Sequence, residues 1–447
     1  MHNTLVPFLR RIARILALAA SIACAPLACA VGAAHAQETQ ADTSAAPSDD
    51  SGIPARRKPQ FAKEFGYALF PYPYSLPGIG SGLSLVGGAL NIDDTYTDVY
   101  GIVFSGGVRG SSFGVADIHL IPRTLILDVG FGYVSRVTVQ SYAQRGMASD
   151  KNDYRLLELG DTAYQGARLT ATFFDRRFEM YSAYYQGASR LQSIRDREGN
   201  VIISTQDSPR NYGHTALFGT RLDLTDDYAN PRRGTRIDLT RTQSPTRGTA
   251  ASYYVIDANA TAYIPLGPRN TWAFNFLRSD AVVRQQGVTD PAALQQNLGL
   301  NCSAIPDPQQ QAFCNQVIAN MIAQNTYGTA TGLGGFNRLR GYPQGRFQGA
   351  HTLFFGTEFR WNLTDEHTPF DIFVMKDVRT SVQLAVFYET GVTSDVRDDL
   401  YKGANWRETY GMGFRIVTAS GVVFRADLGY GREGAGLAVF IGYPWEI

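Results

Sequence analysis

The sequence has few residues that could carry chemistry. Its 447 residues include only four cysteines and six histidines, and no two histidines share the i, i+4 spacing of a helical metal site. No glycine-rich run follows a strand and opens a helix as in a dinucleotide-binding fold, and the P-loop pattern is missing. These absences argue against an enzyme, and we expect no catalytic residues, no metal and no cofactor.

Long apolar stretches are also scarce. The main apolar run, at 15–31, follows three arginines and precedes an Ala-x-Ala cleavage site at 34–36. We therefore expect residues 1–36 to be a signal peptide, and residues 37–60, which are small, polar and proline-containing, to be a disordered leader. No later segment approaches the roughly 18 apolar residues of a membrane helix. The formal net charge of +1 is near neutral, which argues against a nucleic-acid partner.

Cysteine usage fits an exported protein. Cys24 and Cys29 lie within the expected signal peptide, which leaves Cys302 and Cys314 in a segment rich in Gln, Asn and Pro. A pair of cysteines in an exported chain is interpreted first as a local disulfide. We therefore expect Cys302 and Cys314 to be joined.

Glycine and aromatic residues, in contrast, are abundant. The chain has 45 glycines, 25 phenylalanines and 24 tyrosines, whereas charged residues make up only 18%. From residue 61 onward many segments alternate apolar and polar residues with a period of two, which leaves a soluble sandwich or a transmembrane barrel. Charged residues in the middle of strands and aromatic residues near strand ends favour a barrel with a wet lumen. We predict an all-β fold, a transmembrane antiparallel β-barrel.

The number of strands can also be predicted. Fifteen segments between residues 81 and 446 have the strand pattern, and bacterial single-chain barrels use even numbers. The aromatic stretch 61–74 supplies a sixteenth strand, although its two prolines disfavour pairing. The last expected strand, 435–446, places Trp445 on its apolar face. The predicted barrel therefore has sixteen strands and occupies residues 61–447.

One connection stands out by its length. Residues 284–350 join two expected strands, and a loop of this size is usually functional or disordered. Its first half contains the two cysteines and a short expected helix at 311–324. Its second half, from Gly332 to Tyr342, interleaves glycines and aromatic residues around two arginines.

The run Leu339-Arg340-Gly341-Tyr342 resembles the (Val/Ile/Leu)-Arg-Gly-(Phe/Tyr) signature of the BamA/TamA-type surface-antigen barrel superfamily. Three other segments are similar to that family's motifs and occur in the family's order: residues 226–235, 387–391 and 411–431. Five expected strands follow the signature, as the family requires. The resemblance covers roughly residues 200–447. It implies that the long loop folds back into the barrel lumen.

An arginine inside a lumen needs a partner, because an unpaired and partly desolvated guanidinium is costly. The alternation places Glu389, Asp427 and Glu358 on the inward face, and arginine suits a bidentate contact with a carboxylate. Our hypothesis is that Arg340 docks on Glu389, with Asp427 and Glu358 as second choices, and so latches the loop. The simpler alternative is a solvent-exposed loop arginine.

The resemblance implies a monomeric barrel in the outer membrane of a Gram-negative bacterium, surrounded by its lipids, that inserts or translocates client proteins without catalysis. Such barrels normally follow periplasmic POTRA modules, which residues 37–60 are too few to form. A separate periplasmic partner would then deliver the clients. The alternative is a channel or surface-structural barrel for small solutes or lipids.

Overall fold

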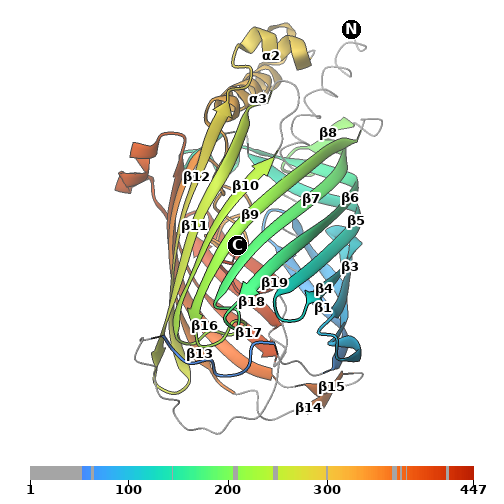
Figure 1. Ribbon diagram of the computed structural model, residues 1–447. Helices are drawn as coiled ribbons and strands as arrows, with labels where there is room; N and C mark the ends of the chain where they lie inside the picture. The colour runs from blue at the N-terminus through green and yellow to red at the C-terminus, as the bar shows by residue number, and fades with distance from the viewer. Residues whose placement is uncertain are drawn as a thin grey trace.

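The structure, a computed structural model, is a closed ring of antiparallel strands (Figure 1). The residues it describes are 53–61, 65–142, 144–204, 210–244, 250–298, 301–364, 370–372, 375–378, 380–418 and 422–446. The main sheet contains seventeen strands, of which the short β8 (Val201–Ser204) pairs only with the end of β7. Sixteen strands therefore close the ring, and the predicted sixteen-stranded all-β barrel is confirmed.

The ring follows the order of the chain, and each strand pairs with the next one. Its members are β1 (Gly66–Leu76), β2 (Gly80–Leu90), β3 (Asp98–Gly106), β4 (Val108–Ile121), β5 (Leu125–Tyr142), β6 (Tyr154–Phe173), β7 (Phe178–Arg195), β9 (Asn211–Thr225), β10 (Gly234–Ser244), β11 (Ser252–Leu266), β12 (Asn270–Gln285), β13 (His351–Asn362), β16 (Thr380–Ser394), β17 (Arg407–Thr418), β18 (Val423–Gly431) and β19 (Gly434–Ile441).

Side chains alternate between an apolar outer face and a polar interior. In β16, Val386 is 56% exposed on the outside, whereas Gln383 and Glu389 are buried inside. The same division holds in β18, where Tyr430 faces outward and Asp427 is buried. A closed barrel with an apolar outer belt and charged groups in its lumen has the arrangement of a transmembrane barrel.

The ring closes at a short seam between its first and last strands. β1 and β19 share a single residue pair, Ser75 with Val439, whereas the shortest other ladder of the sixteen-stranded ring, between β3 and β4, has seven pairs. The prolines that weakened the strand prediction, Pro71 and Pro73, lie in β1. Proline removes a ladder donor and is tolerated best on edge strands, so their position in a seam strand costs little pairing.

The two ends of the barrel differ. We call the end where β1 begins and β19 ends the terminal end, and the opposite end the loop end. The loop end carries α2 (Pro291–Leu298), α3 (Pro308–Tyr327) and the 3-10 turns η2 (Cys302–Ala304), η3 (Arg397–Tyr401) and η4 (Gly403–Asn405). The terminal end carries η1 (Ile92–Asp94) and a small hairpin of β14 (Phe370–Ile372) and β15 (Met375–Val378) (Figure 1). No helix among the described residues is long and apolar enough to cross a membrane.

Several expected strand boundaries differ from the structure, among them the start of the first strand, which lies at Gly66 rather than at 61. Two of the differences have a clear physical reason. β6 begins at Tyr154, seven residues earlier than expected, because it continues to pair with the far end of β5 up to Tyr142. The final strand ends at Ile441 rather than at 446. Gly442, with φ of +103°, turns the chain out of the sheet there, and glycine adopts that region readily. The residues after it leave the barrel wall and enter the lumen.

Candidate functional site

The second half of the β12–β13 connection, residues 328–350, enters the lumen, and we call it the lumen loop. Its base is closed by two backbone hydrogen bonds between Leu333 and Phe347, of 2.9 and 3.0 Å. At its tip the Tyr342 amide donates to the Leu339 carbonyl at 3.0 Å, in a turn where Leu339 has φ of +50°. Burial of apolar side chains favours this inward position. Those side chains are Leu333, Phe336, Leu339, Tyr342 and Phe347.

Arg340 lies at the tip of the lumen loop and is completely buried. Its Nε donates to Glu389 Oε1 at 2.9 Å, its Nη1 to Asp427 Oδ2 at 2.7 Å and its Nη2 to Glu358 Oε2 at 3.1 Å. Its backbone amide also donates to Glu389 Oε2 at 2.9 Å. The guanidinium lies 3.5 Å from the ring centre of Phe387. Each branch of the guanidinium thus meets a carboxylate from a different strand of the wall.

The wall supplies further arginines around these carboxylates. Arg415 and Arg360 both donate to Glu358, and Arg425 Nη1 donates to Asp427 at 3.1 Å. Glu358 and Asp427 therefore keep an arginine partner from the wall even without the loop. Among the described residues, Glu389 forms an ion pair with Arg340 alone. Glu389 is thus the carboxylate that depends on the loop for its counter-charge.

Glycines allow the loop backbone to lie against the wall. A Cβ added at Gly429 of β18 would lie 2.7 Å from the Gly341 nitrogen and 2.8 Å from the Arg340 carbonyl carbon. A Cβ at Gly341 would lie 2.9 Å from the Gly431 nitrogen. No side chain fits between loop and wall at these points, so glycine is needed on both surfaces.

The residues that follow β19 form a second inward segment, 442–446, which we call the tail. Trp445 is 1% exposed, although its strand pattern predicted an outward position. Its indole Nε1 donates to Glu389 Oε1 at 2.8 Å, and its carbonyl accepts from Arg338 Nη2 at 2.9 Å. The tail therefore shares Glu389 with Arg340 and contacts the lumen loop directly.

The structure brings together all the residues predicted to act in the latch. Leu339, Arg340, Gly341 and Tyr342 form the tip of the lumen loop, and Arg340 contacts Glu389, Asp427 and Glu358 together rather than one of them. Sequence reasoning missed the wall arginines and Trp445. The arginines were detectable, because they occupy the same inward parity as the carboxylates. They are Arg360, Arg415 and Arg425.

The two cysteines lie away from the lumen site. Cys302 and Cys314 are joined by a disulfide with a Cα–Cα distance of 5.6 Å, and both are buried. The bond connects η2 to α3 and packs with Leu294 of α2. It therefore holds together the small helical cap at the loop end.

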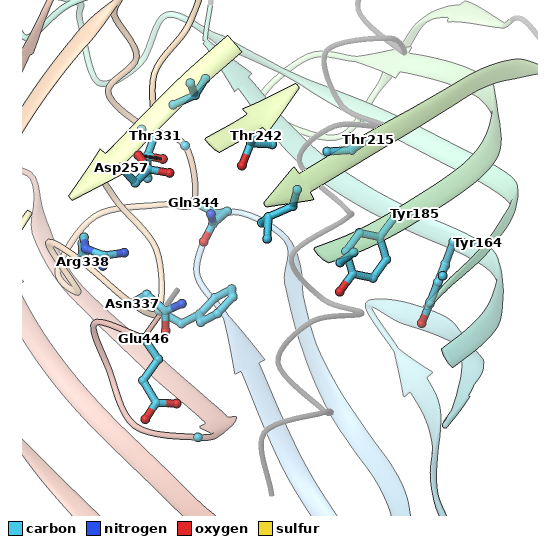
Figure 2. Close-up of a pocket in the computed structure, with 18 of the residues that line it drawn as sticks. Tyr164, Tyr185, Thr215, Thr242, Asp257, Thr331, Asn337, Arg338, Gln344 and Glu446 are labelled. Carbon is cyan, nitrogen blue, oxygen red and sulfur yellow. Dashed lines mark hydrogen bonds between the residues drawn. The ribbon is translucent and has the colours of Figure 1, made fainter. Parts of the chain in front are cut away.

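The lumen loop leaves part of the barrel interior open. A cavity of about 710 Å³ lies between the loop, α3 and a wall that includes β3–β7 and β9–β11. In Figure 2, Asn337, Arg338 and Gln344 line it from the loop, opposite Tyr164 and Tyr185 of the wall. Among the described residues no group of His, Cys, Asp and Glu could hold a metal ion.

The fold and the site define a transmembrane β-barrel with an internal, ion-paired loop. Neither a protein-family model nor a curated protein matches the chain. Among solved structures, BamA from Haemophilus ducreyi lacking POTRA domains 1–3 is similar at 12% identity and a TM-score of 0.44, covering 85% of this chain and 70% of that one.

CdiB from Escherichia coli is similar at 12% identity and a TM-score of 0.43, covering 83% of this chain and 61% of that one. Wzi from Escherichia coli, an outer membrane protein involved in group 1 capsule assembly and a carbohydrate-binding β-barrel, is similar at 11% identity and a TM-score of 0.30, covering 86% and 84%. The barrel assignment rests on the strand pairing of this chain.

Proposed function

We propose that the chain is an outer-membrane barrel that assists the insertion or translocation of other proteins without chemical catalysis. The observation that carries the proposal is the seam. β1 and β19 share one residue pair, so separating them breaks far fewer backbone hydrogen bonds than opening any other ladder of the ring. The resemblance of residues 339–342 and three other segments to the motifs of protein-inserting barrels supports the same function.

The seam suggests how such a barrel works. A strand edge with unpaired amides and carbonyls is a template on which an incoming strand can pair. The contacts that supplement the seam are side-chain ones: the Tyr72 hydroxyl donates to the Phe440 carbonyl at 2.9 Å, and Ser75 Oγ donates to the Leu437 carbonyl at 2.8 Å. These bonds can be exchanged for strand pairing with a client. In this proposal the terminal end faces the periplasm, where a separate partner protein delivers clients.

The alternative is a channel or a surface-structural barrel for small solutes or lipids, and the cavity of about 710 Å³ favours it. A channel needs a continuous path, however, and the lumen loop and the tail both cross the interior. The two functions therefore predict opposite behaviour in a membrane.

Two measurements on the purified full chain separate these functions. In liposomes, the barrel should speed insertion of a urea-unfolded eight-stranded outer-membrane barrel relative to liposomes without it. In planar bilayers, the same protein should give only small and unsteady conductance. Equal insertion rates with and without the barrel, together with large steady pores, would instead establish the channel.

A further inference from the structure

The turn between β9 and β10, residues 226–233, is held in shape by hydrogen bonds from its own side chains. Asp227 Oδ1 accepts from the amides of Ala229 and Asn230, and Asp226 Oδ1 accepts from the amides of Arg232 and Arg233. β9 and β10 are the eighth and ninth strands of a ring of sixteen. This turn therefore lies at the terminal end, across the barrel from the seam.

The segment that precedes β1 docks on this turn. Residues 53–61, which we call the strap, lie across the terminal end of the barrel (Figure 1). The Arg57 amide donates to the Asp226 carbonyl at 2.8 Å, and its side chain pairs with Asp226 at 3.1 Å and Asp227 at 3.2 Å. Lys58 Nζ lies 3.5 Å from Asp227. Gln60 Oε1 accepts from the Tyr228 amide at 2.7 Å.

The segment that follows β19 reaches the same turn. The Tyr443 hydroxyl donates to Asn230 Oδ1 at 2.9 Å, and both residues are buried. Asn230 also accepts a hydrogen bond from Arg57 at its carbonyl, at 2.5 Å. One residue of the turn therefore contacts both the strap and the tail.

These contacts bear directly on the seam strands. Phe61, the buried last residue of the strap, is five residues before Gly66, where β1 begins, so the link between them can span at most about 18 Å. Tyr443 is only two residues beyond Ile441, the end of β19. Neither seam strand can swing far from the barrel wall while its extension stays docked.

We propose that the 226–233 turn is an anchoring site that holds both seam strands closed from the opposite wall, and that the seam opens when the strap or the tail is released. A single residue pair gives the seam little backbone pairing, and the contacts of the strap and the tail with the turn stabilise the closed state instead. A role for seam opening in client insertion rests on the proposed function, but the opening itself can be measured without a client protein.

Hydrogen exchange on the full chain tests whether the strap and the tail hold the seam strands closed. Arg57→Gln with Lys58→Gln weakens the strap, and Tyr443→Phe removes the tail's bond to Asn230. We expect exchange of β1 and β19 amides to rise on the order of tenfold for either change, and further when the changes are combined. Exchange in the β12–β13 ladder should stay as in wild type.

A matched control removes one arginine and one lysine from exposed ion pairs at the loop end, as Arg197→Gln with Lys402→Gln. It should leave the seam strands unchanged. Unchanged exchange of β1 and β19 in the folded combined variant, or in the Tyr443→Phe variant alone if the combined variant does not fold, would overturn the proposed anchoring. If exchange of β1 and β19 rises but the barrel does not speed client insertion, that result would count against the proposed function alone.

Discussion

Replacing Arg340 with alanine should release the lumen loop from the barrel wall. The change removes contacts to three fully buried carboxylates, and Glu389 is then left without an ion-pair partner among the described residues. Leaving one member of a buried ion pair uncompensated costs about 3–5 kcal/mol. Since about 1.4 kcal/mol is a factor of ten, the docked fraction relative to the undocked one should fall by roughly two to three and a half orders of magnitude.

The assay is hydrogen exchange and protease cleavage within residues 328–350 in the folded barrel. Arg340→Ala should raise both, and Arg284→Ala, an exposed arginine at the end of β12, should not. Combining Arg340→Met with Glu389→Gln should recover part of the protection, because no buried carboxylate is then left without its counter-charge. If Arg340→Ala leaves cleavage and exchange in the loop at wild-type levels, the ion pairs do not latch it.

Three further changes test other parts of the structure. Gly429→Ala should also unseat the loop, at a cost of about 1–3 kcal/mol, because its Cβ meets the loop backbone, whereas Gly213→Ala, which meets nothing within 4 Å, should not; equal loop exchange in the two variants would refute the close approach. Burial opposes ionisation of Asp227, but the nearby lysine and arginine of the strap and two amide donors outweigh it and hold the pKa of that carboxyl below its usual value. Ionised Asp227 therefore stabilises docking of the strap fully above the ordinary Asp pKa of about 3.9, and this stabilisation is lost as the pH falls through the lower pKa of the folded protein. A spin label on the strap should become mobile only in strong acid; release near neutral pH would contradict this. Replacing Cys302 and Cys314 with serine should destabilise the helical cap by about 3 kcal/mol, seen as faster cleavage within α2 and α3, while the barrel itself stays folded; barrel unfolding would show a wider role.

The barrel could be predicted from the sequence because the inward and outward faces of a strand depend only on residues adjacent along the chain. Each strand alternates with a period of two, and the parity that placed Glu358, Glu389 and Asp427 inward follows from the strand alone. Adding the motif resemblance made Arg340 a candidate partner for them. The arrangement of three carboxylates around one guanidinium was not predictable, because it depends on which strands are neighbours around the ring.

The strap and the tail could not be predicted for a different reason. Tyr443 and Trp445 continue the apolar parity of β19, so periodicity alone extends the strand through them. The turn at Gly442 redirects them, and nothing in the pattern distinguishes that glycine from those within strands. Likewise, Arg57 and Lys58 lie in a polar segment that has the composition of a disordered leader, and only the fold brings the acidic turn next to them.

The most direct test of the seam as the working part is a reversible lock across it. Cysteines at Ser75 and Val439, the one pair that joins β1 and β19, can close the seam by oxidation. A control pair at Ser279 and Thr352 joins β12 to β13, and wild-type protein receives the same oxidant and reductant. We predict that the oxidised seam pair stops the barrel from speeding client insertion in liposomes, that reduction restores it, and that the control pair has no effect. A locked seam that assists insertion as well as the reduced one would contradict a role for seam opening.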